Sequence, residues 1–285
     1  MIELNKEQLK QLQKKTLKMG VFFAEYCKEN GLLCYLCGGG CIGAVRNGGY
    51  IPWDDDLDFF MPRDDYEKLK KIWKDHERYV LLWPTEQYND HNMFMTLRDK
   101  QTTMIKEYQK DLDIIHGICI DIFPLDGCPS SVFYRLDQLL WGSVYQLYCT
   151  QMVPTNHGRM IAMVGKILLR AVRSPEKRYC IWKYAEKRMS RFNIKKCEYI
   201  TEICAGPKYM KNRYPAKAFS AATYLSFEKE SLPVPVGYDI YLRIAFSDYM
   251  TLPPEEQQYP SHDILFIDVE KPYTYYRKGA SSWKE

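Results

Sequence analysis

The sequence predicts an α/β (or α+β) fold, in which a mixed sheet flanked by helices occupies residues 1–130 and a mainly helical portion occupies residues 131–285. Short apolar or alternating runs, typical of strands, recur through the first portion, with helical patterns between them. Longer helical patterns dominate after residue 131. No obvious linker separates the two portions, so we expect the helical and loop-rich C-terminal portion to pack on the core as one cooperative unit.

The N-terminal segments alternate between helix and strand. In order, they are a helix over residues 3–30, a strand over LLCYLC (32–37), a glycine turn over residues 38–40 and a two-turn helix over CIGAVRN (41–47). The first helix carries apolar residues close to one stripe among lysines and glutamates, and Gly31 ends it. Gly48 and Gly49 stop the second helix.

The following segments supply further strands around one helix. IPWDDDLDFFM (51–61) is typical of a strand, on which Asp56 and Asp58 share one face. PRDDYEKLKKIWKDH (62–76) predicts a helix, because proline favours the first helical position and acids favour the first turn. Other strands are expected at residues 79–84, 91–100, 102–108 and 117–129.

Residues 131 to about 200 are mostly helical in pattern, with charged breaks near residues 173–178. The last third is rich in tyrosine and proline, and SLPVPVGY and LPPEEQQYP are expected to be loops. No internal repeat or low-complexity tract is visible.

The composition is that of a soluble globular protein, with 46% hydrophobic and 27% charged residues. The formal net charge of +4 is too small to indicate a nucleic-acid partner, and no basic run supplies one. No secretory signal opens the chain, so the ten cysteines, including the Cys34–Cys37 pair in an apolar run, are expected to be reduced, buried thiols. We therefore expect a cytoplasmic protein.

Two apolar stretches come closest to a membrane span. Residues 131–153 and 160–172 are each interrupted by charged side chains, and neither reaches about 18 uninterrupted apolar residues. Both are expected to be core helices, and a peripheral contact at the inner face of the membrane stays open as an alternative.

The stretch GGGCIGAVRNGGYIPWDDDLDFF (38–60) combines glycines with four aspartates. Gly38, Gly40 and Gly43 fit a dinucleotide fingerprint, but its helix is too short and four aspartates stay unexplained. A calcium loop starting at Asp54 fails, because phenylalanine stands where glycine is required. A glycosyltransferase D-x-D motif and an acidic surface turn are two further interpretations.

A fourth interpretation uses every part of the stretch. A strand, a glycine turn, a short helix and a strand ending in two alternate aspartates form the layout of the nucleotidyltransferase fold. Such glycines let the backbone approach phosphates, and carboxylates two residues apart hold Mg²⁺ or Mn²⁺ that neutralises them. Asp121, in the alternating run ICIDIF, is the candidate for a third carboxylate beside Asp56 and Asp58.

Three blocks of the sequence resemble the LicD family of phosphocholine transferases, which are related to fukutin. They are GGGCIGAVRNGGYIPWDDDLDFFMPRDDYEKL (38–69), GICIDIFPLDGCP (117–129) and, more weakly, FEKESLPVPVGYDIYLRIAFSDYMTLPPEE (227–256). The family usually has Thr or Ser in place of Gly40, so a hydroxyl able to hold phosphate is missing here. Phe246 and Ser247 likewise replace a Tyr-Gly pair.

The resemblance implies an enzyme that moves a phospho-alcohol from a CDP-linked donor, such as CDP-choline, to a hydroxyl of a surface glycan, lipopolysaccharide or teichoic acid precursor, with release of CMP. Asp56, Asp58 and Asp121 are then the catalytic and metal-binding residues. The expected substrate-binding residues are Gly38, Gly39, Gly40, Arg46, Trp53, Asp55, Arg98 and Lys100. Arg46 lies one helical turn past the glycines, and Asp54 and Asp55 either orient the metal ligands or face solvent.

Two other functions remain open. A metal-dependent nucleotide-sugar glycosyltransferase would use the same aspartates as a D-x-D motif, and a non-catalytic relative would only bind a nucleotide or a glycan. The sequence also leaves open the donor alcohol, the acceptor glycan and the oligomeric state.

Overall fold

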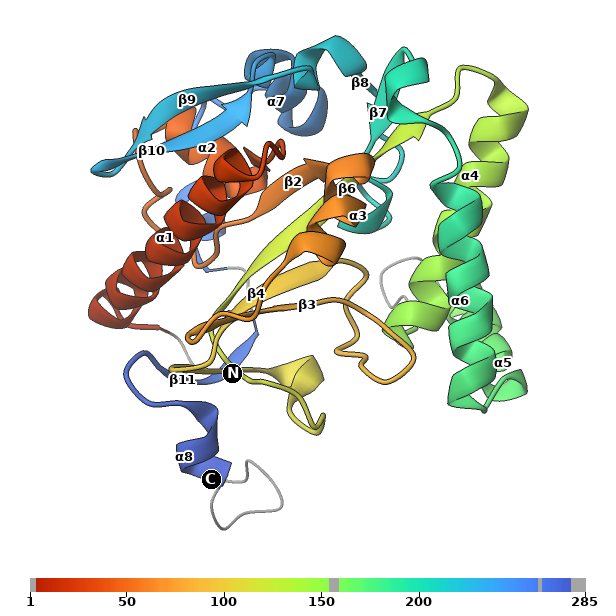
Figure 1. Cartoon of the computed structure of the whole chain (residues 1–285), viewed down its shortest axis with the longest axis horizontal. Coiled ribbons are helices and arrows are strands. Elements are labelled where there is room, and N and C mark those ends of the chain that lie inside the picture. The colour runs from red at the N-terminus through yellow and green to blue at the C-terminus, as the bar shows by residue number, and fades with distance from the viewer. Residues whose placement is uncertain (1–3, 154–158, 261–262, 278–285) are drawn as a thin grey trace. The chain divides into compact units, whose positions relative to one another are not determined.

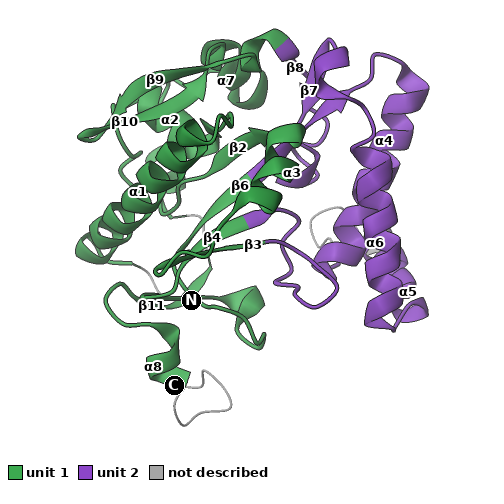
Figure 2. Cartoon of the chain, viewed as in Figure 1, with its two compact units in different colours: residues 1–82, 96–122, 217–285 green, residues 83–95, 123–216 purple. Residues whose placement is uncertain are grey.

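The computed structural model describes residues 4–153, 159–260 and 263–277. The chain divides into two compact units, coloured in Figure 2. The first comprises Met1–Leu82, Thr96–Ile122 and Lys217–Glu285, and the second comprises Trp83–Met95 and Phe123–Ala216. The unit boundary therefore does not coincide with the expected division at residue 130, since residues 217–285 group with the N-terminal part of the chain.

The largest sheet has seven strands, five of which follow the order β1-β2-β6-β4-β3, while two short strands branch from β6 (Figure 1). The five strands are β1 Tyr35–Leu36, β2 Phe59–Pro62, β3 Tyr79–Leu82, β4 Met95–Asp99 and β6 Cys119–Cys128. β1 and β2 run antiparallel with Leu36 opposite Phe59, and β3 and β4 are also antiparallel. Together with its helices, this sheet confirms the predicted mixed α/β class.

Two small antiparallel sheets complete the strands of the first unit. β5 (Thr103–Lys106) pairs with β11 (Ile264–Asp268), and β9 (Ala222–Phe227) pairs with β10 (Glu230–Pro235). The expectation of a loop at SLPVPVGY is therefore wrong over β10. Proline has no N–H to donate to a strand ladder, so it is tolerated only where no such bond is needed. β10 pairs with β9 on one side only, and its other edge makes no ladder hydrogen bonds in this sheet.

The predicted strand over residues 51–61 is confirmed only at its end, because β2 begins at Phe59. Aspartate disfavours strands, and adjacent carboxylates repel each other, so the acidic run forms a loop instead. Asp58 still sits at the end of the ladder, since its carbonyl accepts a hydrogen bond from the Cys37 N–H at 3.0 Å. The glycines 38–40 also differ from expectation: they form the first turn of helix α2 (Gly38–Arg46) rather than a separate turn.

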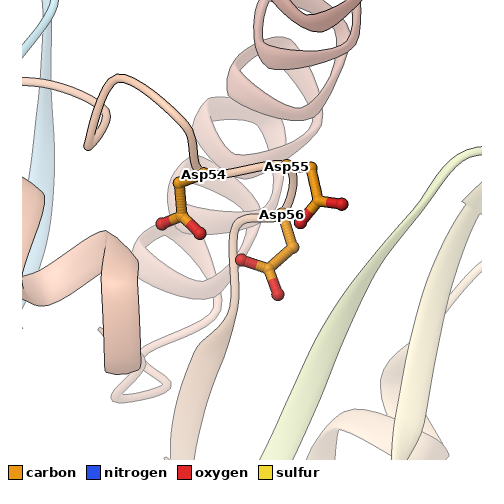
Figure 3. A group of neighbouring side chains, drawn as sticks. All are labelled: Asp54, Asp55 and Asp56. Atoms are coloured by element: carbon orange, nitrogen blue, oxygen red, sulfur yellow. The ribbon is translucent and has the colours of Figure 1, made fainter. Parts of the chain in front are cut away.

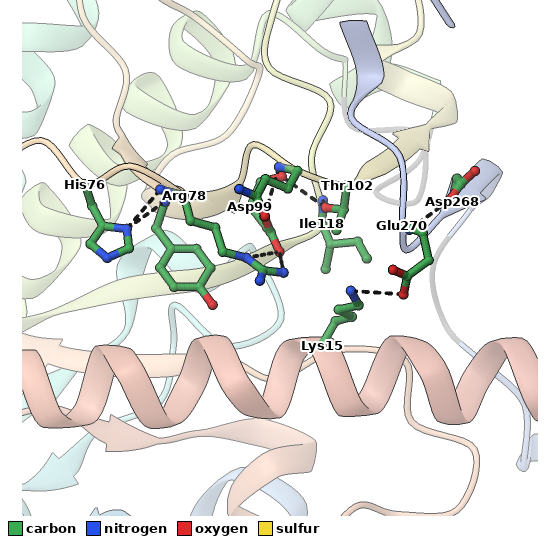
Figure 4. Close-up of polar contacts among 10 residues, drawn as sticks. Lys15, His76, Arg78, Asp99, Thr102, Ile118, Asp268 and Glu270 are labelled. Atoms are coloured by element: carbon green, nitrogen blue, oxygen red, sulfur yellow. Dashed lines mark hydrogen bonds and ion pairs between the residues drawn. The ribbon is translucent and has the colours of Figure 1, made fainter. Parts of the chain in front are cut away.

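The helices of the first unit are α1 Lys6–Glu29, α2 Gly38–Arg46, α3 Arg63–Ile72, α7 Tyr238–Phe246 and α8 Tyr273–Arg277. Asn5 and Gln8 form a capping box that starts α1. α1 packs on β2, with the rings of Phe23 and Phe59 5.1 Å apart. The other end of the sheet is held by an ion pair of 2.6 Å between Arg78 and Asp99, and Lys15 of α1 pairs with Glu270 at 3.2 Å (Figure 4).

The second unit is mostly helical, as the sequence predicts. The expectation that residues 131–153 and 160–172 form core helices is wrong for one face of each helix, where apolar side chains are exposed. The helices of this unit are α4 Val132–Thr150, α5 Arg159–Ala171 and α6 Pro175–Met189, and short strands β7 Tyr199–Thr201 and β8 Tyr214–Pro215 extend from β6. Single 3₁₀ turns along the whole chain are η1 Glu107–Gln109, η2 Ile194–Lys196, η3 Ile203–Ala205, η4 Ala216–Phe219 and η5 Glu255–Gln257. The core contains Tyr145, Cys149, Trp182 and Met189.

Cys34 and Cys37 are buried and free, which confirms the expected state of the CxxC pair. Within the described ranges, no helix combines the length and the apolar character that crossing a bilayer requires. The predicted cytoplasmic location stays a prediction.

Candidate active site

The loop that contains Asp54, Asp55, Asp56 and Asp58, here called the acidic loop, packs against the first turn of α2. A Cβ built on Gly39 would lie 2.1 Å from Asp54 Oδ2, and one built on Gly43 would lie 2.3 Å from the carbonyl oxygen of Gly49. Real Cβ atoms do not come this close to other atoms. At Gly43 the obstacle is backbone, so only glycine fits there, whereas a side chain at Gly39 would displace the Asp54 carboxylate. The glycine spacing thus serves the close packing of residues 49–54 on α2, and a phosphate contact by these glycines stays a prediction.

Three consecutive carboxylates of this loop lie together (Figure 3). One oxygen from each of Asp54, Asp55 and Asp56 lies within 4.8 Å of the others, and Asp55 is 4% exposed. The Gln13 side-chain amide of α1 fixes the loop by donating to the Asp54 carbonyl at 2.8 Å. Burial, followed by the charges of Asp56 and Asp55, raises the pKa of Asp54 to about 8.

Asp58 and Asp121 approach each other from β2 and β6, which are neighbours in the sheet. The Asp121 backbone N–H donates to Asp58 Oδ1 at 3.4 Å. Burial raises the pKa of Asp58 well above its usual range, and the charges of Asp56 and Asp121 add to this effect, while Lys106 opposes it. The sequence therefore correctly placed Asp58 and Asp121 in contact.

A small pocket collects these carboxylates, with a cavity volume of about 10 Å³. It is lined by Asp55, Asp56, Asp58, Met104, Lys106, Cys119, Asp121 and Ile264. This volume is close to the room that one water molecule needs, so the pocket has the size for a single ion rather than for an organic ligand. We call it the acidic pocket.

Lys106 is the functional candidate that sequence reasoning missed. Its Nζ lies 3.8 Å from Asp121 Oδ2, and both side chains are buried. Burial alone would lower the pKa of Lys106, but the charges of Cys119 and Asp121 raise it, and the net shift is upward. The signal was a lysine inside the otherwise apolar strand pattern TMIK, which favours a buried partner of opposite charge.

The acidic pocket and its loop fit a divalent cation. Asp54 Oδ2 and Asp121 Oδ1 are buried, and neither has a hydrogen-bond partner within the described part of the chain. Unpaired buried carboxylate oxygens are costly, and carboxylate oxygens are the ligands that Mg²⁺ and Mn²⁺ prefer. The tightest group is Asp54–Asp55–Asp56, whereas the predicted ligands Asp56, Asp58 and Asp121 meet around the pocket.

Two other glycines contact neighbouring elements. The Gly38 N–H donates to the Tyr241 hydroxyl of α7 at 3.0 Å. A Cβ on Gly40 would point toward the Leu57 and Leu36 side chains, with Leu57 Cδ1 at 3.1 Å. The Thr or Ser expected from the family would therefore place its side chain among apolar atoms, away from the acidic pocket.

The remaining predicted site residues have other partners in the structure. Arg46 ends α2, about 12 Å along the helix axis from Gly38, and donates to the Tyr249 carbonyl at 2.9 Å. Arg98 is 1% exposed and donates to Thr96 Oγ1 and to the Ile115 carbonyl. Lys100 Nζ donates to the His76 carbonyl at 2.8 Å, and Trp53 lies half-buried in the acidic loop. Their substrate contacts stay predictions.

The third sequence block forms β10, α7 and the segment after it, beside α2. Ser247, which replaces a family glycine, has φ of 59° and ψ of −116°. Glycine adopts this conformation readily and serine does not, which explains the family preference. The first unit thus contains the first and third blocks and residues 117–122 of the second, which include Asp121.

Comparison with known proteins agrees with this geometry. Residues 31–138 match the family model described as LicD/FKTN/FKRP, nucleotidyltransferase domain. The chain is 27% identical over 278 residues to the lipopolysaccharide cholinephosphotransferase LicD of Haemophilus influenzae, covering 91% of this chain and 97% of that protein. The matched region contains the glycines of α2, the acidic loop, Lys106 and Asp121. The chain is therefore similar to the LicD family through the part that holds the candidate site, and to one of its members along most of its length.

Proposed function

We propose that this protein transfers phosphocholine, or a closely similar phospho-alcohol, from a CDP-linked donor to a hydroxyl of a cell-surface glycan such as lipopolysaccharide or a teichoic acid precursor, with release of CMP. The Haemophilus influenzae protein that this chain resembles over 91% of its length is a lipopolysaccharide cholinephosphotransferase. The observation that carries the proposal is the convergence of Asp56, Asp58 and Asp121 on one ion-sized pocket.

In this proposal, Asp56, Asp58 and Asp121 hold Mg²⁺ or Mn²⁺, and Asp54 and Asp55 complete or orient the set. A bound divalent cation supplies Lewis-acid stabilisation of the negative charge on the diphosphate. Lys106 holds Asp121 in place and adds positive charge beside the phosphates.

The reaction exchanges one phosphorus–oxygen bond for another. The acceptor hydroxyl oxygen bonds to the phosphorus that carries the alcohol, and the bond from that phosphorus to the CMP oxygen breaks. The hydroxyl proton passes to a carboxylate of the acidic pocket. Asp121, whose Oδ1 has no hydrogen-bond partner among the described residues, is the candidate base if Asp56 and Asp58 alone hold the metal.

The substrates need room outside the acidic pocket. A groove of about 630 Å³ lies between α1 and the β9–β10 turn, and this volume suits a small-molecule site. Its charged lining consists of four lysines and two glutamates, Lys10, Lys14, Lys18, Lys229, Glu228 and Glu230, and this excess of cations suits an anionic substrate. Gln13, whose amide holds the Asp54 carbonyl, also lines it. This connection favours the groove as the place where part of the donor or acceptor lies.

The test is CMP release from CDP-choline with Mg²⁺ or Mn²⁺ and a glycan acceptor, with a chelator as the metal-free arm. Asp58→Asn is expected to lose about a thousandfold in turnover, because the metal contribution is several kcal/mol. Asp75→Asn, at an exposed carboxylate, is the matched control and should keep wild-type turnover.

Unchanged turnover in Asp58→Asn would remove Asp58 from the mechanism. A donor panel tests the alternatives: preference for a UDP- or GDP-sugar over CDP-linked choline, ribitol or glycerol would favour the glycosyltransferase. Nucleotide or glycan binding without metal binding would favour the non-catalytic relative.

A further inference from the structure

Helix α5 of the second unit has apolar residues on two opposite faces. Leu169 and Val172 of one face pack against the core cluster around Trp182 and Cys149. The opposite face points to solvent and contains Met160, Met163, Val164, Ile167 and Leu168, which are 41–74% exposed. A surface helix ordinarily places polar residues on its outward face, so this outward face requires a partner.

The first half of α4, in the same unit, repeats this pattern. Its outward side chains Val132, Phe133, Leu136 and Leu140 are 58–84% exposed. Its opposite face is buried through Arg135, Gln138 and Tyr145. The second unit therefore has two outward apolar helix faces, one on α4 and one on α5.

The charges beside α5 identify the chemistry of the partner. Residues 151–175 include four cations, Arg159, Lys166, Arg170 and Arg173, and no aspartate or glutamate. Lys166 and Arg170 are exposed and lie one helical turn apart, so they flank the apolar face on one side. An apolar helix face flanked by cations is the pattern of helices that lie in the interface of an anionic bilayer.

We propose that the outward faces of α4 and α5 dock this protein on the surface of an anionic lipid bilayer. α5 has 13 residues, about 20 Å of helix, which is too short to span a bilayer but suits a position in its interface. A second copy of the chain fits less well, because pairing two α5 faces would bring cations against cations in a segment that has no acid.

The test is co-sedimentation of the full-length protein with vesicles of phosphatidylcholine alone or with phosphatidylglycerol added. We expect binding to the anionic vesicles that weakens with salt, and much weaker binding to the neutral ones. Ile167→Glu should weaken binding about tenfold or more, because an inserted apolar side chain becomes a charge. Leu252→Glu is the matched control, since Leu252 is 55% exposed, compared with 58% for Ile167, but lies in the first unit.

A conservative variant, Lys166→Gln with Arg170→Gln, separates the charge contribution from folding. Each cation removed should cost about fivefold in affinity for anionic vesicles, with the melting temperature unchanged. Wild-type vesicle binding by both variants would overturn the proposal. An absence of vesicle binding, with a dimer in light scattering that Ile167→Glu dissociates, would overturn it in favour of an interface between copies.

Discussion

Each unit of this protein buries a charged cluster, and the two clusters differ in how well their polar atoms are paired. In the second unit, Arg135 of α4 donates to Gln138 Oε1 at 2.7 Å, to Thr201 Oγ1 at 3.0 Å and to the Met210 carbonyl. Gln138 in turn donates to the carbonyls of Gly127 and Met189. In the first unit, five carboxylates lie around the acidic pocket and its loop, and the buried Lys106 pairs with one of them, Asp121. Two carboxylate oxygens of this group have no hydrogen-bond partner among the described residues.

This difference in pairing is the one expected between a structural network and the proposed metal site. A buried charge with complementary partners holds elements together, and its removal costs stability. Buried side chains of like charge repel each other and lower the free energy of unfolding. Such clusters are found at sites that bind a counter-ion or catalyse a reaction. Mutations in the two clusters should therefore change stability in opposite directions.

The largest effect is expected from Arg135→Leu. The variant removes the donor from Gln138, Thr201 and the Met210 carbonyl while all three stay buried, so we expect a loss of about 3 kcal/mol in the free energy of unfolding. Urea denaturation measures it. Arg135→Lys, which keeps one charged donor, should lose less, and equal stability of Arg135→Leu and wild type would contradict the structural role of this network.

A smaller effect of opposite sign is expected from Asp58→Asn. This variant removes one charge from the cluster, keeps an oxygen that can accept from the Asp121 N–H, and leaves the Asp121–Lys106 pair intact. Without metal it should be more stable than wild type by about 1 kcal/mol, although it is expected to be inactive. Mg²⁺ should raise the melting temperature of wild type more than that of the variant. A destabilised Asp58→Asn would show that the carboxylates are structural.

A third effect is a pH dependence of stability in the first unit, which is measured as a slope rather than as a difference at one pH. The pKa of Asp54 is raised to about 8, from an ordinary value of 3.8, so the folded chain keeps this proton where the unfolded chain has lost it. In the metal-free protein, the contribution of Asp54 to the free energy of unfolding is therefore fully present below about pH 4 and is lost as the pH rises toward 8. Asp54→Asn should flatten this slope in thermal melts, and Asp75→Asn should not; an unchanged slope in Asp54→Asn would contradict the assignment.

The sequence by itself determined the kinds of elements around the candidate site and singled out the aspartates that line it. The spacing of the glycines, the run of aspartates and the alternating ICIDIF are local patterns, and local patterns are what hydrophobic periodicity and motifs encode. For this reason α1, β6 and the helical stretch that begins near residue 131 were predicted with nearly correct bounds, and α3 was predicted four residues too long at its end.

Only the tertiary structure decided which side chains meet. Lys106 lines the acidic pocket on a strand, β5, whose partner β11 lies more than 150 residues later in the chain, and no local pattern shows such a pairing. Arginine is usually exposed, but Arg98 is buried. Asp55 is also buried, although exposure to solvent was one of the two expectations for it. Burial and long-range pairing depend on how distant segments pack. Here the packing of segments distant in sequence places Lys106 and Asp121 beside the aspartates of the acidic loop and so forms the ion-sized pocket.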